Sequence, residues 1–287
     1  MFMSSVLFLM ASSVSAAPSE PVQAYFQAHR GGLDEVPENT MAAFRHAWTV
    51  EGAVPEVDIQ TTKDGVMVCM HDDTPARTTD APAPLCDMRV PELTFAQIEQ
   101  WDAGIKFASQ YAGEKVPQLR ALFEEMRGWP ERQLYLDLKG VDLAALKALI
   151  EEYSLFEQVI FVHATQTGCI EVTKQFPGAR TMTWCSGLPP QIKKRFETLA
   201  ASNFEGISQL QFHLQVIEPG DGITYMLDDA YLKEAFAKMK AAGVEMQLRP
   251  FEFDAASLRR LLDMGVRWFV ADAPARFASC LRDAYSK

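Results

Sequence analysis

The sequence predicts an α/β protein that folds as a (β/α)₈ barrel with a small insertion after the second strand. Two observations carry this prediction. Strand-like and helix-like segments alternate along nearly the whole chain, and 287 residues suit one barrel of about 250 residues. An open doubly wound sheet is the alternative, but no G-x-G-x-x-G motif follows the first strand-like segment.

Eight short segments rich in β-branched and aromatic residues are the expected barrel strands. They cover residues 22–28, 55–60, 133–139, 158–164, 179–185, 205–211, 244–249 and 266–272. The amphipathic segments that follow them are the expected helices, at residues 40–51, 118–127, 142–153, 167–176, 190–202, 228–242, 255–264 and 276–285. Gly243 and Gly265 stand where helices should end, directly before strands.

One stretch breaks the alternation directly after the second strand. Asp64-Gly65 separates two strand-like runs, which is a strong signal for a β-hairpin. The second run, residues 66–70, must then be antiparallel to the first, so it cannot be a barrel strand. We therefore expect residues 61–116 to form an insertion within a single barrel domain that covers residues 17–287.

The composition is that of an acidic globular protein. The chain has 48% hydrophobic and 23% charged residues, which argues against a disordered protein. Its 27 Lys and Arg against 38 Asp and Glu give a formal net charge of −11. Such an acidic surface argues against a nucleic-acid partner, and it means that an anionic substrate would need locally concentrated positive charge.

Residues 1–16 resemble a secretory signal peptide. The apolar run 6–11 is followed by Val14-x-Ala16, which fits the small-residue rule for cleavage after Ala16. The alternative is an apolar helix packed on the fold. The run is too short to span a bilayer and charges interrupt every later apolar stretch, so we expect no stable membrane anchor. A periplasmic or secreted protein could form one disulfide, for which Cys69 and Cys86 are the nearest pair.

Polar residues gather where the predicted strands end. In a barrel of this kind the chemistry lies at the carboxyl ends of the strands. Side chains two residues apart on a strand share a face, and the hairpin should bring its last residues opposite the second strand. A turn at Asp64-Gly65 would place His71 opposite Asp58, and a turn one residue earlier would place it opposite Glu56. The residues expected to converge are His29, Arg30, Glu56, Asp58, His71, Asp137 and Lys139.

These residue types favour phosphoryl chemistry at a metal ion. Carboxylates that converge repel one another unless a cation lies between them, and oxygen ligands suit Mg²⁺ or Ca²⁺. Two histidines suit a general acid and a general base, because imidazole titrates near neutral pH. Arg30 and Lys139 suit the oxygens of a phosphate. His163 and His213 also lie near strand ends, but no carboxylate pairs with them, which indicates structural roles.

The same residues resemble the glycerophosphodiester phosphodiesterase family. The similarity covers nearly the whole mature chain, and the order and spacing of its motifs match together. They are His29-Arg30-Gly31, Pro37-Glu38-Asn39-Thr40, Glu56-x-Asp58, Asp64-Gly65, His71-Asp72, Arg77-Thr78-Thr79, Gly113-Glu114-x-Val116-Pro117 and Asp272-x-Pro274.

The resemblance implies a TIM barrel that hydrolyses glycerophosphodiesters to glycerol 3-phosphate and an alcohol with one divalent cation, Mg²⁺ or Ca²⁺. It implies acid–base roles for His29 and His71. The implied metal ligands are Glu56 and Asp58, which we expect Asp137 to join, and the implied phosphate-binding and site-shaping residues are Arg30, Lys139, Glu38 and Asn39. Trp184 is a candidate wall for the leaving group.

Two positions depart from the family pattern. The family usually has Glu where this chain has Asp137, and it tends to carry a Trp-containing stretch where this chain has Leu248-Arg249-Pro250. Arg249 could bind a second anionic group of the substrate, or form a salt bridge at the barrel rim. A lipid phosphodiesterase of the sphingomyelinase D or phospholipase D type and a non-catalytic periplasmic binder remain alternatives. The head group, the metal, the identity of the base and the oligomeric state stay open.

Overall fold

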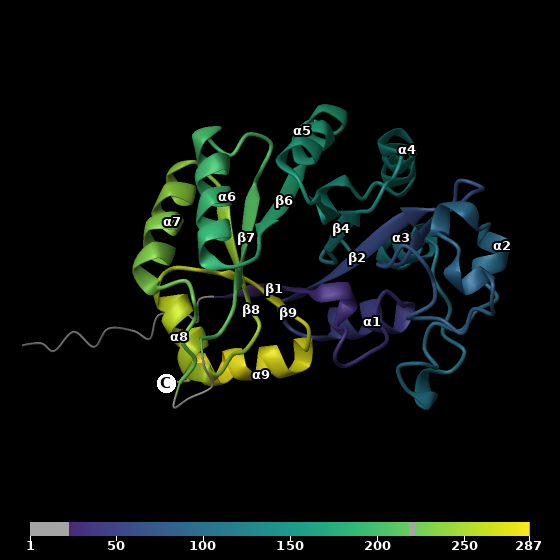
Figure 1. Ribbon diagram of the computed structural model, residues 1–287, viewed down its shortest axis with the longest axis horizontal. Coiled ribbons are helices and arrows are strands. Elements are labelled where there is room, and N and C mark those ends of the chain that lie inside the picture. The colour runs from purple at the N-terminus through teal and green to yellow at the C-terminus, as the bar shows by residue number, and fades with distance from the viewer. Residues whose placement is uncertain (1–22, 218–221, 287) are drawn as a thin grey trace, which may run out of the picture.

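The structure, a computed structural model, describes residues 23–217 and 222–286. Eight parallel strands and one antiparallel strand form a single sheet (Figure 1). Their order is β1-β9-β8-β7-β6-β5-β4-β2-β3, and β1 also pairs with β2, which closes the eight parallel strands into a barrel. The strands are β1 Tyr25–Ala28, β2 Ala53–Thr61, β3 Met67–Cys69, β4 Leu134–Leu138, β5 Val159–Val162, β6 Arg180–Cys185, β7 Gln209–Leu214, β8 Glu245–Pro250 and β9 Trp268–Ala271.

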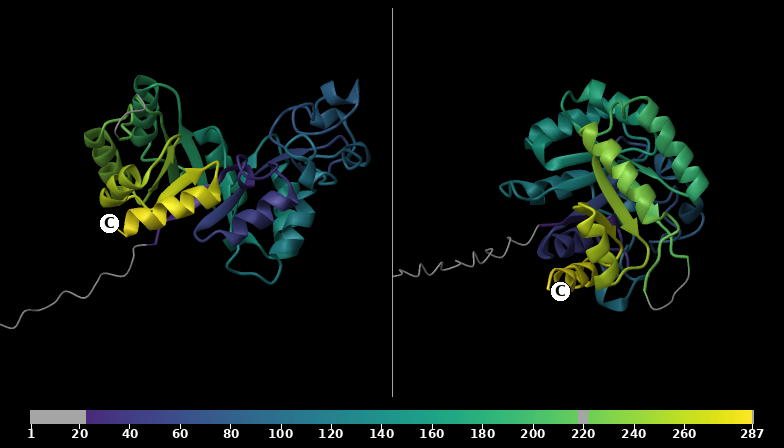
Figure 2. Two further views of the ribbon diagram at one scale, coloured as in Figure 1. Left: turned by 90° about the horizontal axis from the view of Figure 1, so that it is seen from below. Right: turned by 90° about the vertical axis from the view of Figure 1, so that its left-hand side faces the viewer.

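Helices follow the parallel strands and cover the outside of the barrel, so the predicted (β/α)₈ fold is confirmed (Figures 1 and 2). The α-helices are α1 Met41–Thr49, α2 Phe95–Ile98, α3 Leu119–Met126, α4 Leu143–Tyr153, α5 Gln166–Gln175, α6 Pro189–Ala201, α7 Asp229–Ala241, α8 Ala255–Asp263 and α9 Pro274–Tyr285. Short 3₁₀ turns are η1 His29–Gly31, η2 Leu85–Asp87, η3 Val90–Glu92, η4 Ser109–Tyr111 and η5 Phe156–Gln158. None of the helices in the described ranges has the length and apolar character needed to cross a membrane.

The segment between β2 and α3 extends away from the barrel, on the side opposite α7 (Figure 1). It contains β3, α2, η2, η3 and η4, as expected for the insertion. It also has a small core of its own, in which Val68, Leu93, Ile98 and Trp101 are buried. Apolar burial of this kind stabilises the insertion without using the barrel core.

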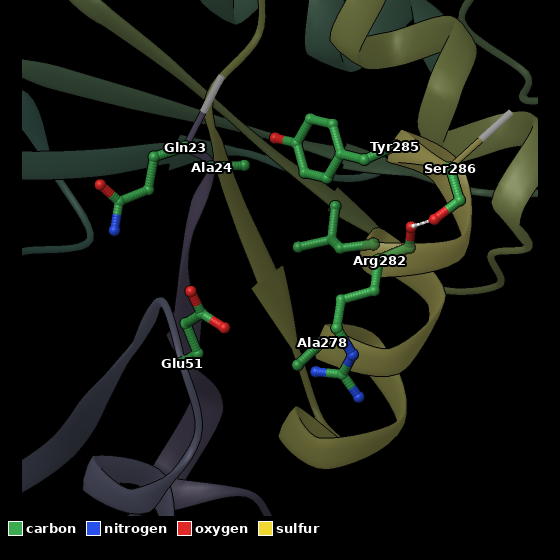
Figure 3. A pocket seen from close by; sticks show the side chains of 8 residues that line it. Gln23, Ala24, Glu51, Ala278, Arg282, Tyr285 and Ser286 are labelled. Atoms are coloured by element: carbon green, nitrogen blue, oxygen red, sulfur yellow. Dashed lines mark hydrogen bonds between the residues drawn. The ribbon is translucent and has the colours of Figure 1, made fainter. Parts of the chain in front are cut away.

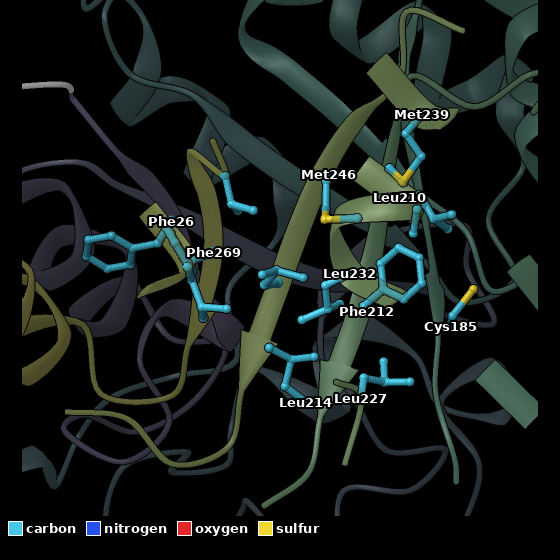
Figure 4. Close-up of a cluster of buried hydrophobic side chains, with 14 of the residues drawn as sticks. Phe26, Cys185, Leu210, Phe212, Leu214, Leu227, Leu232, Met239, Met246 and Phe269 are labelled. Carbon is cyan, nitrogen blue, oxygen red and sulfur yellow. The ribbon is translucent and has the colours of Figure 1, made fainter. Parts of the chain in front are cut away.

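Side chains along β7 alternate between the apolar layer under the helices and the polar interior of the barrel. Leu210, Phe212 and Leu214 face outward and are buried against the helices, within the cluster drawn in Figure 4. Gln209 and Gln211 alternate with them and face the barrel interior. Because side chains on a strand alternate between its faces, the next inward position, His213, lies at the carboxyl end of the strand.

The barrel interior is closed by a network of buried amides. The Tyr135 hydroxyl donates to Gln209 Oε1 at 2.8 Å and accepts from Gln247 Nε2 at 3.2 Å. Gln211 Nε2 donates to Gln247 Oε1 at 2.7 Å. These bonds satisfy polar groups that would otherwise be costly to bury. The interior is therefore packed, and chemistry in a barrel of this kind takes place at the mouth formed by the carboxyl ends of the strands.

The hairpin loop is one residue longer than the sequence predicted. Thr62 N donates to Val66 O at 2.9 Å, so three residues, Lys63 to Gly65, form the loop instead of two. Gly65 has φ 81°, the left-handed conformation that such loops require at their last residue. The Thr62 hydroxyl supports the loop by accepting from Val66 N and donating to Asp64 Oδ1.

This extra residue changes the cross-strand partners. Gln60 lies opposite Val68, and Met70 N donates to Asp58 O at 2.9 Å. The predictions that His71 lies opposite Asp58 or opposite Glu56 are therefore both wrong. His71 follows the end of β3 and reaches the site from a loop.

The predicted strand at 205–211 is also displaced, because β7 begins only at Gln209. Left-handed conformations at Asn203, Phe204 and Gly206 form a turn that delays the strand. All five cysteines are free thiols, so the structure has no Cys69–Cys86 disulfide. The predicted signal peptide, residues 1–16, lies outside the described residues.

Candidate active site

Three buried carboxylates meet at the carboxyl end of two neighbouring strands. Glu56 and Asp58 share the inner face of β2, and Asp137 of β4 lies in register with Asp58. One ligand oxygen of each residue lies within 4.8 Å of the other two, and all three side chains are buried. Burial and the neighbouring carboxylates raise the pKa values of Glu56 and Asp137. This cluster could hold a divalent cation, as predicted, because it offers the hard oxygen ligands that such ions take.

Two cationic side chains border this carboxylate cluster. Lys139 Nζ lies 2.7 Å from Asp137 Oδ2 and 3.3 Å from Asp58 Oδ1. Arg30 donates its backbone N–H to Glu56 Oε2 at 2.7 Å, and its Nε lies 3.7 Å from Asp58 Oδ2 without a hydrogen-bond partner. The structure thus brings both predicted phosphate-binding cations to the cluster.

The turn that carries Arg30 depends on its glycines. Arg30 has φ 53°, and Gly31 and Gly32 also have positive φ. A Cβ on Gly31 would lie 2.6 Å from Cβ of Ala43 in α1, so a larger residue cannot pack there without displacing the helix. The His-Arg-Gly-Gly sequence therefore positions the Arg30 backbone N–H against Glu56.

Asn39 orients Asp58 through two hydrogen bonds. Asn39 Nδ2 donates to Asp58 Oδ2 at 2.9 Å, and Asp58 N donates to Asn39 Oδ1 at 3.0 Å. Asn39 has φ 56°, a conformation that Asn adopts more readily than most residues. The N-cap of α1 is the next residue, Thr40, so Asn39 is free to contact the site. Glu38 lies between Arg30 and Arg77 and accepts from both.

Each of the two candidate acid–base histidines is bound by an aspartate. His29 Nδ1 lies 2.8 Å from Asp272 Oδ1, and His71 Nδ1 lies 2.7 Å from Asp72 Oδ1. A carboxylate at Nδ1 fixes the tautomer and leaves Nε2 of each ring for proton transfer. Burial lowers the pKa of His29, and Asp272 opposes that effect.

An arginine in turn holds each aspartate. Arg77 donates to both oxygens of Asp72, at 2.6 and 2.9 Å, and its hydrogen bonds lower the pKa of Asp72. Arg249 Nη2 lies 2.9 and 3.2 Å from the two oxygens of Asp272. Asp72 and Asp272 belong to the motifs of the sequence, but their partnership with the two histidines was not predicted. The adjacency of His71 and Asp72 in the sequence could have indicated that the two side chains interact. No such signal exists for Asp272, which meets His29 only because β9 pairs with β1.

The remaining candidates line the barrel mouth. Trp184 of β6 packs against the apolar cluster of the barrel interior, and its half-buried ring contributes to the wall. His213 of β7 lies beside Arg249 of β8, with its ring edge-on to Phe251. His213 Nε2 lies 2.8 Å from Gln211 Oε1, and burial lowers the pKa of His213 to about 3. His213 is therefore a neutral side chain of the mouth.

A pocket also lies at the other end of the barrel. It has a volume of about 560 Å³ and is lined by residues before β1 and by α9, including Gln23, Ala278, Arg282 and Ser286 (Figure 3). The carboxylate cluster lies at the opposite, carboxyl ends of β2 and β4. The pocket in Figure 3 is therefore separate from the candidate active site.

Comparison with known proteins gives one consistent family. Residues 29–147 match the family model of the glycerophosphoryl diester phosphodiesterase family. A glycerophosphodiester phosphodiesterase of Caldanaerobacter subterraneus is 36% identical over 157 residues, which are 52% of this chain and 62% of that protein. Human glycerophosphodiester phosphodiesterase 1 is 39% identical over 134 residues, covering 46% of this chain and 39% of that protein. These matches span less than two thirds of either relative.

Longer matches have lower identity. A Bacillus subtilis glycerophosphodiester phosphodiesterase is 26% identical over 296 residues, covering 95% of this chain and 92% of that protein. The crystal structure of an Agrobacterium tumefaciens glycerophosphodiester phosphodiesterase has a TM-score of 0.71 at 23% identity and covers 90% of this chain and 100% of that one. An Oleispira antarctica phosphodiesterase in complex with the product sn-glycerol-3-phosphate has a TM-score of 0.69 at 22% identity, covering 91% and 97%.

At such identities the solved structures establish the shared fold. The family-model match covers the segment that contains both histidines and all three clustered carboxylates. Residues 29–147 are therefore similar to the glycerophosphodiester phosphodiesterase family, and the chain as a whole shares the fold of solved structures that carry this name.

Proposed function

We propose that the protein hydrolyses glycerophosphodiesters to glycerol 3-phosphate and an alcohol. The observation that carries this proposal is the carboxylate cluster flanked by two histidines whose Nδ1 atoms are both held by carboxylates. Cleavage of a phosphodiester needs charge stabilisation at the phosphoryl oxygens and one proton transfer at each of two oxygens. The named relatives support the substrate class.

Glu56, Asp58 and Asp137 are the proposed ligands of one divalent cation, Mg²⁺ or Ca²⁺. The donor set fits such an ion, because three buried carboxylates lie close together and burial raises the pKa values of Glu56 and Asp137. When bound, the ion would polarise the phosphoryl group as a Lewis acid. Arg30 and Lys139 would contribute positive charge on the same side of the phosphate.

His29 and His71 are the proposed acid–base pair. One would take a proton at Nε2 from the attacking hydroxyl or water, and the other would give a proton from Nε2 to the leaving oxygen. Asp272 and Asp72 hold the opposite nitrogens, so both rings keep the orientation that this exchange needs. Asn39 and Glu38 are proposed to fix Asp58 and Arg30, and Trp184 to line the leaving-group side of the mouth.

Exposed apolar side chains on loops after the strands are a reason to test a lipid substrate as well. Within the described residues, most of the large exposed apolar side chains lie on loops that follow carboxyl ends of strands. They are Ile105, Phe107, Leu188, Ile217, Met226 and Phe251. Lipid head groups that carry acyl chains would contact such a rim.

A substrate panel with and without EDTA tests the proposal. Purified enzyme is given glycerophosphocholine, glycerophosphoethanolamine, glycerophosphoglycerol and a lysophospholipid, and glycerol 3-phosphate and free alcohol are measured. We expect turnover of the water-soluble diesters, loss in EDTA and recovery with added Mg²⁺ or Ca²⁺. Preferential turnover of the lysophospholipid would favour a lipid phosphodiesterase, and tight binding without turnover would favour a binder. Either of these two results would refute the proposed function.

We further propose a single barrel domain over residues 17–287 and removal of residues 1–16 by a signal peptidase, which would give a periplasmic or secreted protein. The sequence around Val14-x-Ala16 is the basis of the second proposal. Expression of the full chain in a Gram-negative host, followed by fractionation and amino-terminal sequencing, tests it. A cytoplasmic protein that still begins at Met1 would contradict this proposal.

A further inference from the structure

Arg249, Asp272 and His29 meet at one point: Arg249 Nη2, Asp272 Oδ1 and His29 Nδ1 lie within hydrogen-bonding distance of one another. Arg249 lies on β8, and its Nη2 is 3.0 Å from His29 Nδ1 as well as 2.9 Å from Asp272 Oδ1. Asp272 Oδ1 is itself 2.8 Å from His29 Nδ1. The side chains of His29 and Arg249 are only 16% and 15% exposed, so water competes little for these contacts.

The directions of the hydrogen bonds follow from the charges. Burial raises the pKa of Asp272, but the hydrogen bond from His29 and the charge of Arg249 outweigh it and lower the pKa to about 2. Asp272 is therefore an ionised acceptor, and an arginine can only donate. The consistent arrangement has His29 Nδ1–H and Arg249 Nη2–H both donating to Asp272. Arg249 then acts on His29 through the carboxylate.

The second histidine also has an aspartate and an arginine, although Arg77 uses two nitrogens where Arg249 uses Nη2 alone. Arg77 holds Asp72 in bidentate fashion, and Asp72 binds His71 Nδ1. An arginine that grips both oxygens restricts rotation of a carboxylate, because two parallel bonds fix its plane. Two independent occurrences of arginine, aspartate and histidine in one site indicate a common purpose.

We propose that Arg249 is a positioning residue that holds Asp272 against His29 Nδ1, so that His29 Nε2 faces the substrate. This inference rests on the proposed function. It differs from the use of Arg249 as a binding site for a second anionic group, because its Nη2 is already engaged by Asp272. The other charged or titratable groups that face His29 are Arg30 of η1 and His213 of β7.

A double-mutant cycle tests whether Arg249 acts through His29. We expect Arg249→Ala to lower kcat by about 10- to 100-fold, the scale of a misplaced proton-transfer group, with KM changed less than about threefold. Arg249→Lys keeps a cationic donor and should recover most of the rate. In a His29→Ala background, Arg249→Ala should have no further effect beyond about twofold.

The matched control is Arg259→Ala, which removes an exposed ion pair with Asp263 on α8 and should leave kcat and KM unchanged. A loss of similar size in the His29→Ala background, or a loss that appears mainly in KM, would overturn the proposal in favour of direct substrate binding. If Arg249→Ala does not fold, Arg249→Gln keeps a donor without the charge and replaces it in the cycle.

A spectroscopic measurement separates this inference from the proposed function. The Nδ1 proton of His29, hydrogen-bonded to a carboxylate, should give a low-field proton resonance that His29→Ala removes. We expect Arg249→Ala to lose or broaden this resonance and Arg249→Lys to retain it. An unchanged resonance in Arg249→Ala would overturn the inference, even if the wild-type protein hydrolysed no diester. Failure of the substrate panel with the expected resonance change would instead reject only the proposed function.

Discussion

Replacing Asn39 by Asp should destabilise the protein in a way that depends on pH. The substitution keeps the acceptor for Asp58 N but replaces the donor that lies 2.9 Å from Asp58 Oδ2 with a second carboxylate oxygen. Asn39 and Asp58 are both buried, at 3% and 1% exposure, so water cannot screen the repulsion. The folded protein can relieve it by keeping a proton on the introduced carboxyl group, which would then donate to Asp58.

The cost of that proton sets an upper limit on the destabilisation. Holding a proton at pH 7 on a group with an unfolded pKa of about 3.9 costs about 4 kcal/mol, and at pH 5 about 1.5 kcal/mol. Because the folded-state pKa of the introduced group is raised, the loss of stability is absent below pH 3.9 and grows as pH rises. Arg30 and Lys139 lie near Asp58 and should reduce the loss at pH 7 to about 2–4 kcal/mol.

Urea unfolding at pH 5 and pH 7, in EDTA, measures this difference. Asn39→Gly is the matched control, since Gly also tolerates φ 56° and loses both hydrogen bonds without adding a charge. Its loss of about 2–4 kcal/mol should be the same at both pH values. An Asn39→Asp protein that is as stable as the wild type at pH 7, or whose loss does not shrink at pH 5, would refute the reasoning.

Four other variants should behave as follows. His71→Ala should lower kcat by about 10²- to 10⁴-fold in a steady-state assay with KM little changed, and an undiminished rate would refute its acid–base role. Gly31→Ala should lose about 1–3 kcal/mol in urea unfolding, because its Cβ would lie 2.6 Å from Cβ of Ala43, whereas Gly65→Ala has nothing within 4 Å and should lose only about 1 kcal/mol. Equal losses would contradict this account. His213 has a folded pKa of about 3, below its unfolded value, so it costs stability as pH falls through 6.5. Thermal unfolding of His213→Gln between pH 6.5 and 5 should therefore show a smaller decline than the wild type, and an equal decline would count against a buried neutral His213.

The barrel and the carboxylate cluster were predictable because both depend on short-range periodicity. Glu56 and Asp58 are two residues apart on one strand, which places them on one face in any β-sheet. Asp137 joins them because neighbouring parallel strands end at the same edge of the barrel. Here the local pattern determined the result.

The errors arose where backbone conformation was not visible in the pattern. Asp64-Gly65 fits hairpin loops of two or three residues, and the single added residue shifted every cross-strand partner. The left-handed turn at Asn203 and Phe204 makes β7 begin later than predicted. Such a turn is hard to predict from sequence, because residues other than glycine rarely adopt this conformation. The link between His29 and Asp272 joins residues 243 positions apart and depends on closure of the barrel.

The hairpin register has a consequence for how the site can be divided. His29 and the three carboxylates belong to the barrel, but His71 is supplied by the insertion, and Gln60 Nε2 anchors that segment by donating to Met70 O and Asp72 O at 2.9 and 2.7 Å. A barrel that lacked residues 61–116 would retain Glu56, Asp58 and Asp137 but hold only one of the two proposed acid–base histidines. The insertion is therefore a modular part of the proposed active site, and chimaeras between relatives should exchange it together with β2.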